Sequence, residues 1–335
     1  MPETLITSEV DYEAEGRQTG YLRVPHSVTR SAYGFIPVPV TVLKNGDGPT
    51  MVLMGGTHGD EYEGQIAIDR LAKNVRPEEI TGRVICLPML NFPAADAGLR
   101  CSPIDEGNLN RAFPADPRGT PTQLIAHYVE EVLMPMADYA IDLHSGGASL
   151  LYPPTFMRCP GWTEEEAEML RKLQDAFDLP YAWVFTGGGG PNSSARTTMG
   201  AAARKGVVTV NAELGGGGAM TSEILALAER GLRRCLHAVG MLPGYEPDGT
   251  RGTRELHIQG LVYAYDRGVF EPLLGPGDAV EPGTILAAIH HPDDPTRAPT
   301  EIASGYDGMI LAKRALGRVE RGDALFQIAR DVDRP

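Results

Sequence analysis

The sequence predicts an α/β fold, a mixed sheet flanked by helices, followed by a small C-terminal all-β domain. Short apolar runs alternate with amphipathic helical patterns up to residue 243. Beyond that point the helical periodicity disappears, and short β runs recur between glycines. The 40 Gly and 27 Pro among 335 residues indicate many tight turns. We therefore expect two domains, residues 1–243 and 244–335.

The first region carries six predicted strands and five predicted helices. Two early β-branched runs span 20–24 and 36–43, and four short apolar runs, too short for amphipathic helices, span 51–55, 83–90, 137–143 and 206–212. Apolar residues at three- and four-residue spacing predict helices over 62–75, 121–136, 163–177, 195–205 and 220–239. Thr163 followed by Glu166 has the spacing of a capping box.

The second region reads as a small barrel or sandwich. Its short runs cover 261–265, 268–274, 284–289, 308–312 and 324–329, and they alternate with Gly-Asp turns in a way that weakly resembles lipoyl-like domains. No lipoyl or biotinyl lysine motif is visible. We therefore expect a structural part, a lid over a site or an oligomer contact.

Composition narrows the class of protein. A net charge of -14 without a Lys/Arg block argues against a nucleic-acid partner. No run of ~18 apolar residues occurs, and the acidic start of the sequence lacks an apolar core, so neither a membrane span nor secretion is expected. Cys86, Cys101, Cys159 and Cys235 form no C-x-x-C pair, which favours a reduced, cytoplasmic protein.

Polar side chains follow each buried strand of the first region. His58 and Glu61 come after the first of these strands, Asn110-Arg111 lie in the loop after the second, His144 follows the third and Glu213 the fourth. Ligands bind at the carboxyl ends of strands in open α/β sheets, provided that the strands run parallel. We therefore expect these residues to share one site.

His58, Glu61 and His144 match the needs of a catalytic zinc, which takes three protein ligands and one open position. The H-x-x-E spacing alone arises often by chance, and a helix-start Glu is favoured by the helix dipole. A second histidine directly after a neighbouring strand strengthens the zinc interpretation. Asp142, on the same strand face as His144, is either a partner that orients its imidazole or a buried structural acid.

Glu213 opens the stretch AELGGGGAM, in which the glycines would permit close approach of the backbone to a ligand. A carboxylate beside a metal site can act as a general base, taking a proton from water and passing it to the leaving amine. The alternatives are a fourth zinc ligand or an ordinary turn acid.

Asn110 and Arg111 stand in a loop that is poor in other cations and that also contains Arg100. The planar fork of Arg111 suits a carboxylate, and Arg100 could polarise a scissile carbonyl or lie on the surface. The run Gly187 to Gly190 could bind an anion ahead of a helix, but we interpret it as a mobile loop.

Other chemistries lack their motifs. The sequence has no H-E-x-x-H, no G-x-S-x-G, no G-x-x-x-x-G-K-[ST] and no completed G-x-G-x-x-G. The remaining six histidines lie in loops, in predicted helices or in the late β region, where we expect no metal ligand: His26, His127, His237, His257, His290 and His291.

The stretches GGTHGDEYEG, GNLNRAFP, DLHSGG and AELGGGG, in this order and with a late β region, resemble the succinylglutamate desuccinylase/aspartoacylase family, which is related to the zinc carboxypeptidases. The resemblance covers nearly the whole chain. It implies a zinc-carboxypeptidase-like sheet and one Zn²⁺ held by His58, Glu61 and His144. It further implies Glu213 as base and acid, Arg111 with Asn110 as the carboxylate grip, and Arg100 as the carbonyl-polarising arginine.

Within the family, VTVLKNGDGPTMVLMGGTHGDEYEG and SPIDEGNLNRAFP look most like members that deacetylate N-alpha-acetyl-L-2,4-diaminobutyrate in ectoine degradation. The alternatives are another N-acyl amino acid, of the N-acetylaspartate or succinylglutamate type, or carboxypeptidase-like cleavage. The spacing from Arg100 to Asn110-Arg111 differs from that in aspartoacylases. No third arginine stands in a matching motif, although Arg196 could serve. A non-catalytic binding protein would lack a ligand or the base, and all four residues are present.

Overall fold

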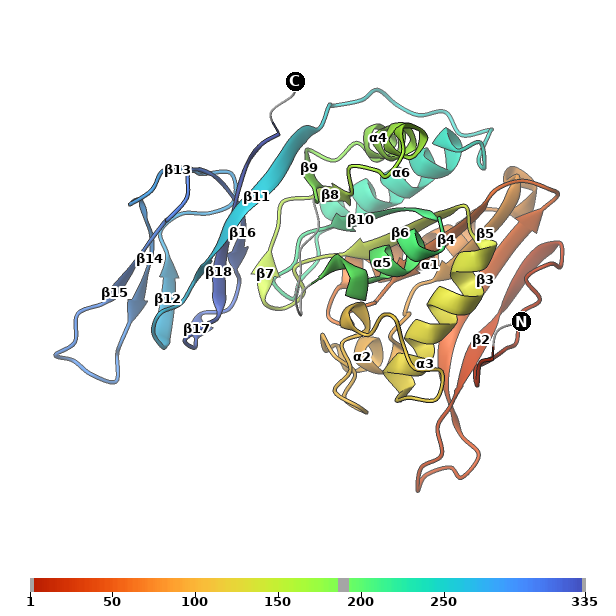
Figure 1. Ribbon diagram of the computed structural model, residues 1–335, viewed down its shortest axis with the longest axis horizontal. Helices are drawn as coiled ribbons and strands as arrows, with labels where there is room; N and C mark the ends of the chain where they lie inside the picture. The colour runs from red at the N-terminus through yellow and green to blue at the C-terminus, as the bar shows by residue number, and fades with distance from the viewer. Residues whose placement is uncertain (1–2, 186–192, 333–335) are drawn as a thin grey trace.

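A computed structural model describes residues 3–185 and 193–332 (Figure 1). The described residues form one mixed sheet of 14 strands and a second, antiparallel sheet of four strands. In the large sheet the order is β1-β2-β3-β5-β4-β6-β10-β8-β9-β11-β18-β16-β13, and β7 pairs with β16 at the side of this path. The predicted fold class, a mixed α/β sheet with helices and a small C-terminal β part, is confirmed.

The part of the large sheet that precedes residue 240 contains these strands: β1 (Thr7–Ser8), β2 (Gly16–Pro25), β3 (Phe35–Asn45), β4 (Thr50–Gly55), β5 (Gly82–Leu87), β6 (Tyr139–His144), β7 (Leu150–Leu151), β8 (Thr155–Arg158), β9 (Tyr181–Val184) and β10 (Val208–Glu213). Neighbouring strands β5, β4, β6 and β10 run parallel, as the site prediction required. Their carboxyl ends therefore lie at one edge of the sheet.

Helices cover both faces of this sheet (Figure 1). One buried cluster joins the sheet to α1 (Tyr62–Asn74), α4 (Glu164–Phe177) and α6 (Ser222–Ala238). A second cluster joins the opposite face to α3 (Pro121–Tyr128) and α5 (Thr198–Arg204). Strands buried on both faces are expected to be almost uniformly apolar, which is why the sequence shows them as short continuous runs.

Several element ends differ from the predicted ones for local reasons. The predicted strand 83–90 ends at Leu87, because Pro88 follows and has no amide hydrogen for the ladder. The predicted helix 121–136 is α-helical only to Tyr128 and continues as a π turn, Val129–Leu133, and a 3₁₀ turn, Met134–Met136. Thr163 caps α4 by accepting from Glu166 N, whereas the Glu166 carboxylate accepts from Trp162 N, so the box is only half formed.

The elements of the first region that the sequence missed include α2 (Phe92–Ala97), the strands β8 and β9, and the two-residue strands β1 and β7. The omission of β9 matters most, since β9 pairs in parallel with β11 (Arg254–Tyr263) and so extends the large sheet into the C-terminal part of the chain. β11 starts seven residues before the predicted run at 261.

The C-terminal strands after β11 are β12 (Gly268–Pro272), β13 (Ala279–Val280), β14 (Ile285–His290), β15 (Thr300–Ala303), β16 (Gly308–Arg314), β17 (Arg318–Val319) and β18 (Ala324–Asp331). The small sheet, β15-β14-β12-β17, shares a buried cluster with β11, β16 and β18 of the large sheet, and this cluster includes Phe270, Ile289 and Phe326. Division of the chain at residue 243 stays a prediction. Among the described residues, no helix is long and apolar enough to span a bilayer.

Candidate active site

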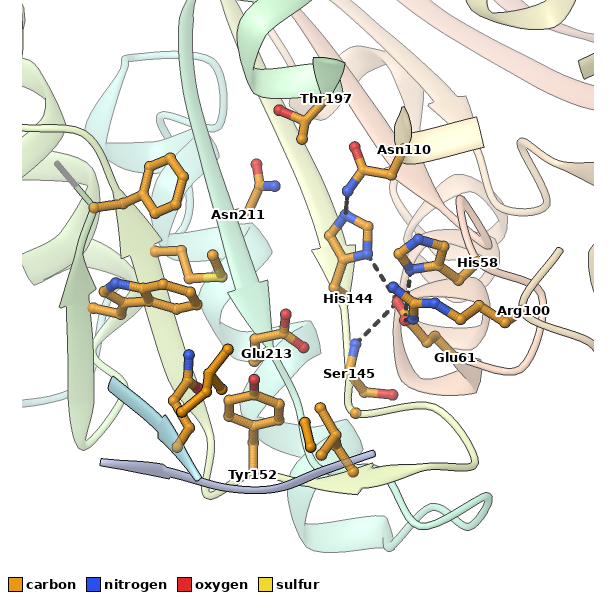
Figure 2. Close-up of a pocket in the computed structure, with 18 of the residues that line it drawn as sticks. His58, Glu61, Arg100, Asn110, His144, Ser145, Tyr152, Thr197, Asn211 and Glu213 are labelled. Atoms are coloured by element: carbon orange, nitrogen blue, oxygen red, sulfur yellow. Dashed lines mark hydrogen bonds and ion pairs between the residues drawn. The ribbon is translucent and has the colours of Figure 1, made fainter. Parts of the chain in front are cut away.

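The carboxyl ends of β4, β6 and β10 open onto a cavity of about 560 Å³ (Figure 2). All seven residues predicted as site residues line it: His58, Glu61, Arg100, Asn110, Arg111, His144 and Glu213. They come from the ends of three strands and from the connection between β5 and α3, so only the folded sheet brings them together.

The turn between β4 and α1 depends on glycines at close contacts. A Cβ at Gly59 would lie 2.0 Å from the carbonyl carbon of Ala94, and a Cβ at Gly64 would lie 2.7 Å from Leu143 Cβ. A larger residue at either position would push this turn away from α2 or α1 away from β6. Glu61, the N-cap residue of α1, is therefore held against the end of β6, where His144 lies.

His58, Glu61 and His144 form a buried cluster whose ligating atoms all lie within 4.8 Å of one another. His58 Nδ1 is 2.7 Å from Glu61 Oε1, and His144 Nδ1 is 2.8 Å from Glu61 Oε2. Among residues 3–185 and 193–332 this is the one group of three or more His, Cys, Asp or Glu side chains that could hold a metal ion.

The outer nitrogen of each imidazole has its own partner. His58 Nε2 is 3.2 Å from Asn108 Oδ1, and His144 Nε2 is 3.0 Å from Asp142 Oδ2. Asp142 also accepts hydrogen bonds from the hydroxyls of Thr57 and Thr198. With a metal at Nδ1, each ring would carry its proton on Nε2, where these oxygens can accept it, which is the arrangement that metal-bound histidines use.

Charges within the cluster are strongly coupled. Burial alone would lower the pKa of His144, but the carboxylates of Asp142 and Glu61 outweigh it and raise that pKa well above its usual value. Burial would raise the pKa of Glu61, but His58 and His144 hold it below its usual range. Burial lowers the pKa of His58. The cluster therefore attracts one positive charge, which a proton on His144 supplies in the metal-free protein.

Glu213 lies beside this cluster without belonging to it. It pairs with His144 in the parallel register of β10 and β6, and its Oε2 is buried without a hydrogen-bond partner. Burial and the negative charge of Glu61 raise the pKa of Glu213 to about 8. A carboxyl group tuned toward neutrality can both take and give a proton near neutral pH.

The predicted arginines lie at the cavity but differ in burial. Arg100 Nη1 is 3.3 Å from Glu61 Oε1, and its side chain is 43% exposed, so it reaches the cluster from the mouth. Arg111 is fixed by its own bond to Asn110 O at 2.6 Å. Burial and the neighbouring cations Arg100 and Arg196 lower the pKa of Arg111.

Asn110 has less freedom than the sequence suggested. Its Oδ1 accepts from Thr198 N at 3.0 Å, and its Nδ2 is 3.3 Å from His144 Nε2 (Figure 2). The oxygen is therefore committed to the start of α5, and the amide nitrogen is the atom that remains available to a ligand.

The glycines that follow Glu213 lie close to other parts of the chain. Gly215 to Gly218 all have positive φ, and a Cβ at Gly216 would lie 2.2 Å from Leu150 O. Asp60, left without a role by the sequence, accepts from Ala148 N at 2.7 Å and so anchors the loop after β6. The run Gly187 to Gly190 lies outside the described residues.

The sequence missed much of the cavity wall. Two amide side chains, Asn211 and Gln327, line it, together with aromatic residues and part of the C-terminal strands. Other residues that line this wall are Tyr152, Met157, Trp183, Phe185, Tyr263 and Asp323. Asn211 could have been found, because it stands two residues before Glu213 on the same strand face. Residues from β11 and β18 gave no local signal.

A buried His-Glu-His cluster beside a buried carboxyl group, at the carboxyl edge of a mixed α/β sheet, defines a hydrolase whose site can hold a metal. The succinylglutamate desuccinylase/aspartoacylase catalytic domain matches residues 47–239. The chain belongs to this family of amide hydrolases, as its sequence motifs predicted.

Similarity to individual relatives extends over almost the full chain. The N-alpha-acetyl-L-2,4-diaminobutyric acid deacetylase of Halomonas elongata is 39% identical over 98% of this chain and 96% of its own length. The product-bound ectoine utilization protein EutE (DoeB) of Ruegeria pomeroyi superimposes with a TM-score of 0.92, at 35% identity over 98% of this chain and 99% of its own. A succinylglutamate desuccinylase/aspartoacylase from Rhodobacter sphaeroides gives a TM-score of 0.90, at 37% identity over 98% of each chain.

Proposed function

We propose that the protein is a zinc-dependent deacetylase of N-alpha-acetyl-L-2,4-diaminobutyrate that acts in ectoine breakdown. The reaction adds water across the acetyl amide bond and gives acetate and the free amino acid. The observation that carries the proposal is one cavity in which the His-Glu-His cluster, Glu213 and two arginines converge. The substrate is proposed from similarity to the Halomonas elongata deacetylase over 98% of the chain.

The cluster fits zinc. It offers two imidazole nitrogens and one carboxylate, and the outer nitrogens are engaged by Asn108 and Asp142. His58 and His144 would bind through Nδ1, and Glu61 through its carboxylate. Bound zinc would act as a Lewis acid on the acyl carbonyl and make water a better nucleophile at neutral pH.

The chain's own groups then divide the remaining work. Arg111, with the Nδ2 of Asn110, would hold the substrate carboxylate and fix the amide against the cluster. Arg100 would donate a hydrogen bond to the acyl oxygen as negative charge develops there. Glu213 would take a proton from the attacking water at its carboxylate and deliver it to the amide nitrogen, so that the amine leaves neutral.

Further properties follow as parts of the same proposal. The substrate is a small molecule, which suits a cavity of about 560 Å³ walled on one side by C-terminal strands.

We place the enzyme in the cytoplasm, since Cys86, Cys101, Cys159 and Cys235 form no disulfide. A homo-oligomer with contacts through the C-terminal strands stays a prediction.

The test is hydrolysis of an N-acetyl amino acid panel by zinc-loaded protein. We expect kcat/KM to be highest for N-alpha-acetyl-L-2,4-diaminobutyrate. It should be lower for N-acetylaspartate, for N-succinylglutamate and for dipeptides, which test carboxypeptidase-like cleavage. Chelated protein is the control and should be inactive until zinc is restored. A preference for acidic side chains would overturn the substrate, and full activity without metal would overturn the mechanism.

A further inference from the structure

Asn211 is a buried amide whose oxygen has no hydrogen-bond partner. The residue is only 4% exposed, lines the cavity, and its Oδ1 is bonded to no protein atom. An unpaired buried polar atom costs free energy, so such an atom in a binding cavity indicates a group that a ligand completes. None of the roles assigned above uses Asn211.

The position of Asn211 relates it to the reacting groups and to an aromatic wall. It stands two residues before Glu213 on β10, and the two side chains face the same space (Figure 2). Across the sheet, Asn211 pairs with Met157, and Met157 pairs with Trp183, so these three side chains share one face. The rings of Trp183 and Phe185 pack edge to face, 5.5 Å apart, and both line the cavity.

Charge is distributed unequally around the cavity. Arg100 and Arg111 are its only lysine or arginine lining residues within the described part of the chain, and the proposed function uses both. On the other side stand Glu213, the amides of Asn211 and Gln327, and Asp323, which is paired with Arg314 at 3.0 Å. The described lining residues on that side include no lysine or arginine, so an acidic substrate side chain would find no cationic partner among them, whereas an ammonium group would meet oxygen acceptors and ring faces.

We propose that Asn211, with the rings of Trp183 and Phe185, forms the subsite that selects substrates with an ammonium group on the amino-acid side chain. The inference rests on the proposed deacetylase function and names its specificity determinant. The Asn211 amide can turn over, so its oxygen can accept from the ammonium group, and the rings stabilise the cation through their faces.

The test compares two substrates that differ only at the side-chain terminus, N-alpha-acetyl-L-2,4-diaminobutyrate and N-acetyl-L-norvaline, in which a methyl group replaces the ammonium. The readout is the ratio of their kcat/KM values. We expect Asn211→Leu to lower this ratio by about 10- to 150-fold, the range for loss of a hydrogen bond to a charged group. The ratio of Kd values for the two free amino acids, from calorimetry, should change in parallel.

Asn211→Asp gives the decisive second variant, since it barely alters the shape of the residue. An acceptor role predicts that the added carboxylate raises the ratio at pH 8.5, and an unchanged or lower ratio overturns the proposal. Thr209→Val is the matched control. Thr209 lies two residues earlier on the same strand face, is buried with an unpartnered hydroxyl and does not line the cavity, so its ratio should match the wild type.

The outcomes separate the two proposals. A wild-type protein that hydrolyses neither substrate, with zinc bound, overturns the proposed function itself. If the wild-type protein prefers the ammonium substrate, but Asn211→Leu keeps the wild-type ratio and Asn211→Asp does not raise it, only the subsite is overturned. Metal content and thermal unfolding of each variant show whether it is folded, and a Leu variant that fails to fold leaves the Asp variant to decide.

Discussion

The two parts of the cavity differ in how many of their polar atoms have partners. In the metal cluster, all four imidazole nitrogens of His58 and His144 lie within hydrogen-bond distance of an oxygen. On the other side, Asn211 Oδ1, Gln327 Oε1 and Glu213 Oε2 are buried without partners. The first part is organised before any substrate arrives, and the second contains groups that a substrate can complete.

The partnered and the unpartnered polar atoms are expected to have different roles, the first in metal binding and the second in contact with a ligand. Partnered ligands fix the ring orientations that metal binding requires, and each partner lowers the cost of burial. Unpartnered atoms reduce the free energy of unfolding, and natural proteins keep such atoms where a ligand uses them. We therefore expect changes in the cluster to act on metal binding, and changes opposite it to act on rate and selectivity.

The largest effect should follow loss of a ligand in the organised part. His144→Ala removes one of three metal ligands and also leaves the buried Asp142 without its imidazole partner. We expect loss of bound metal and a fall in kcat/KM of at least about 10³-fold. Metal analysis and the deacetylase assay measure both. His127→Ala, on α3 and bonded to Glu3 O, is the control, and a His144 variant that retained metal and turnover would refute the ligand set.

Glu213→Gln should show most clearly that the metal cluster and the opposite side of the cavity have different roles. The variant keeps the shape of the side chain but cannot carry a proton, so we expect kcat to fall by about 10²- to 10⁴-fold with metal content unchanged. Glu131→Gln, which breaks an ion pair with Lys205 away from the cavity, is the control. Loss of metal in the Gln variant would instead make Glu213 a fourth ligand.

Asp142→Asn should have an intermediate effect, which we expect on the affinity for the metal. Asp142 accepts from Thr57 and Thr198 and orients His144, and substitution of such an outer partner typically costs 10- to 100-fold in metal affinity, so we expect about that loss. Competition with a chelator measures it. Asp138→Asn, which lies just before β6 at the opposite end and accepts from Thr50 N, should leave affinity unchanged. Equal affinities in both variants would contradict the orienting role.

The organised part could be predicted from the sequence, and most of the opposite wall could not. His58, Glu61, His144 and Glu213 each follow an apolar run, and parallel strands bring their carboxyl ends together without any further information. Short spacing and local pattern were sufficient, because each residue is placed by the strand that precedes it.

Gln327 and Tyr263 are placed by long-range pairing instead. They reach the cavity because β9 pairs with β11 and β11 pairs with β18. The paired residues are 73 positions apart in the sequence at the first step and between 61 and 75 apart at the second. Neither β9 nor the early half of β11 has a distinctive pattern. Orientation of side chains also escaped prediction, since Asn110 Oδ1 is committed to Thr198 N of α5.

The smallest effect concerns the stability of the metal-free protein. The contributions of Glu213 and Glu61 to this stability should change in opposite directions as the pH rises. The pKa of Glu213 is raised to about 8, so the folded protein holds a proton that the unfolded chain releases above about pH 4.5. Stability from this group is complete below pH 4.5 and is lost as pH rises to 8. The pKa of Glu61 is lowered, so its contribution is present above pH 4.5 and is lost only in more acid solution.

Urea unfolding of metal-free protein between pH 5 and 8 tests this difference. Wild type should lose stability across that range, by a few kcal/mol at most, and Glu213→Gln should lose less, because its side chain does not titrate. The raised pKa of His144 contributes a loss of the same sign in both proteins, so the difference between them isolates Glu213. Parallel plots of unfolding free energy against pH for the two proteins would mean that Glu213 is already ionised near pH 5. In that case neighbouring groups, and not a bound proton, would offset the cost of burying its charge beside Glu61.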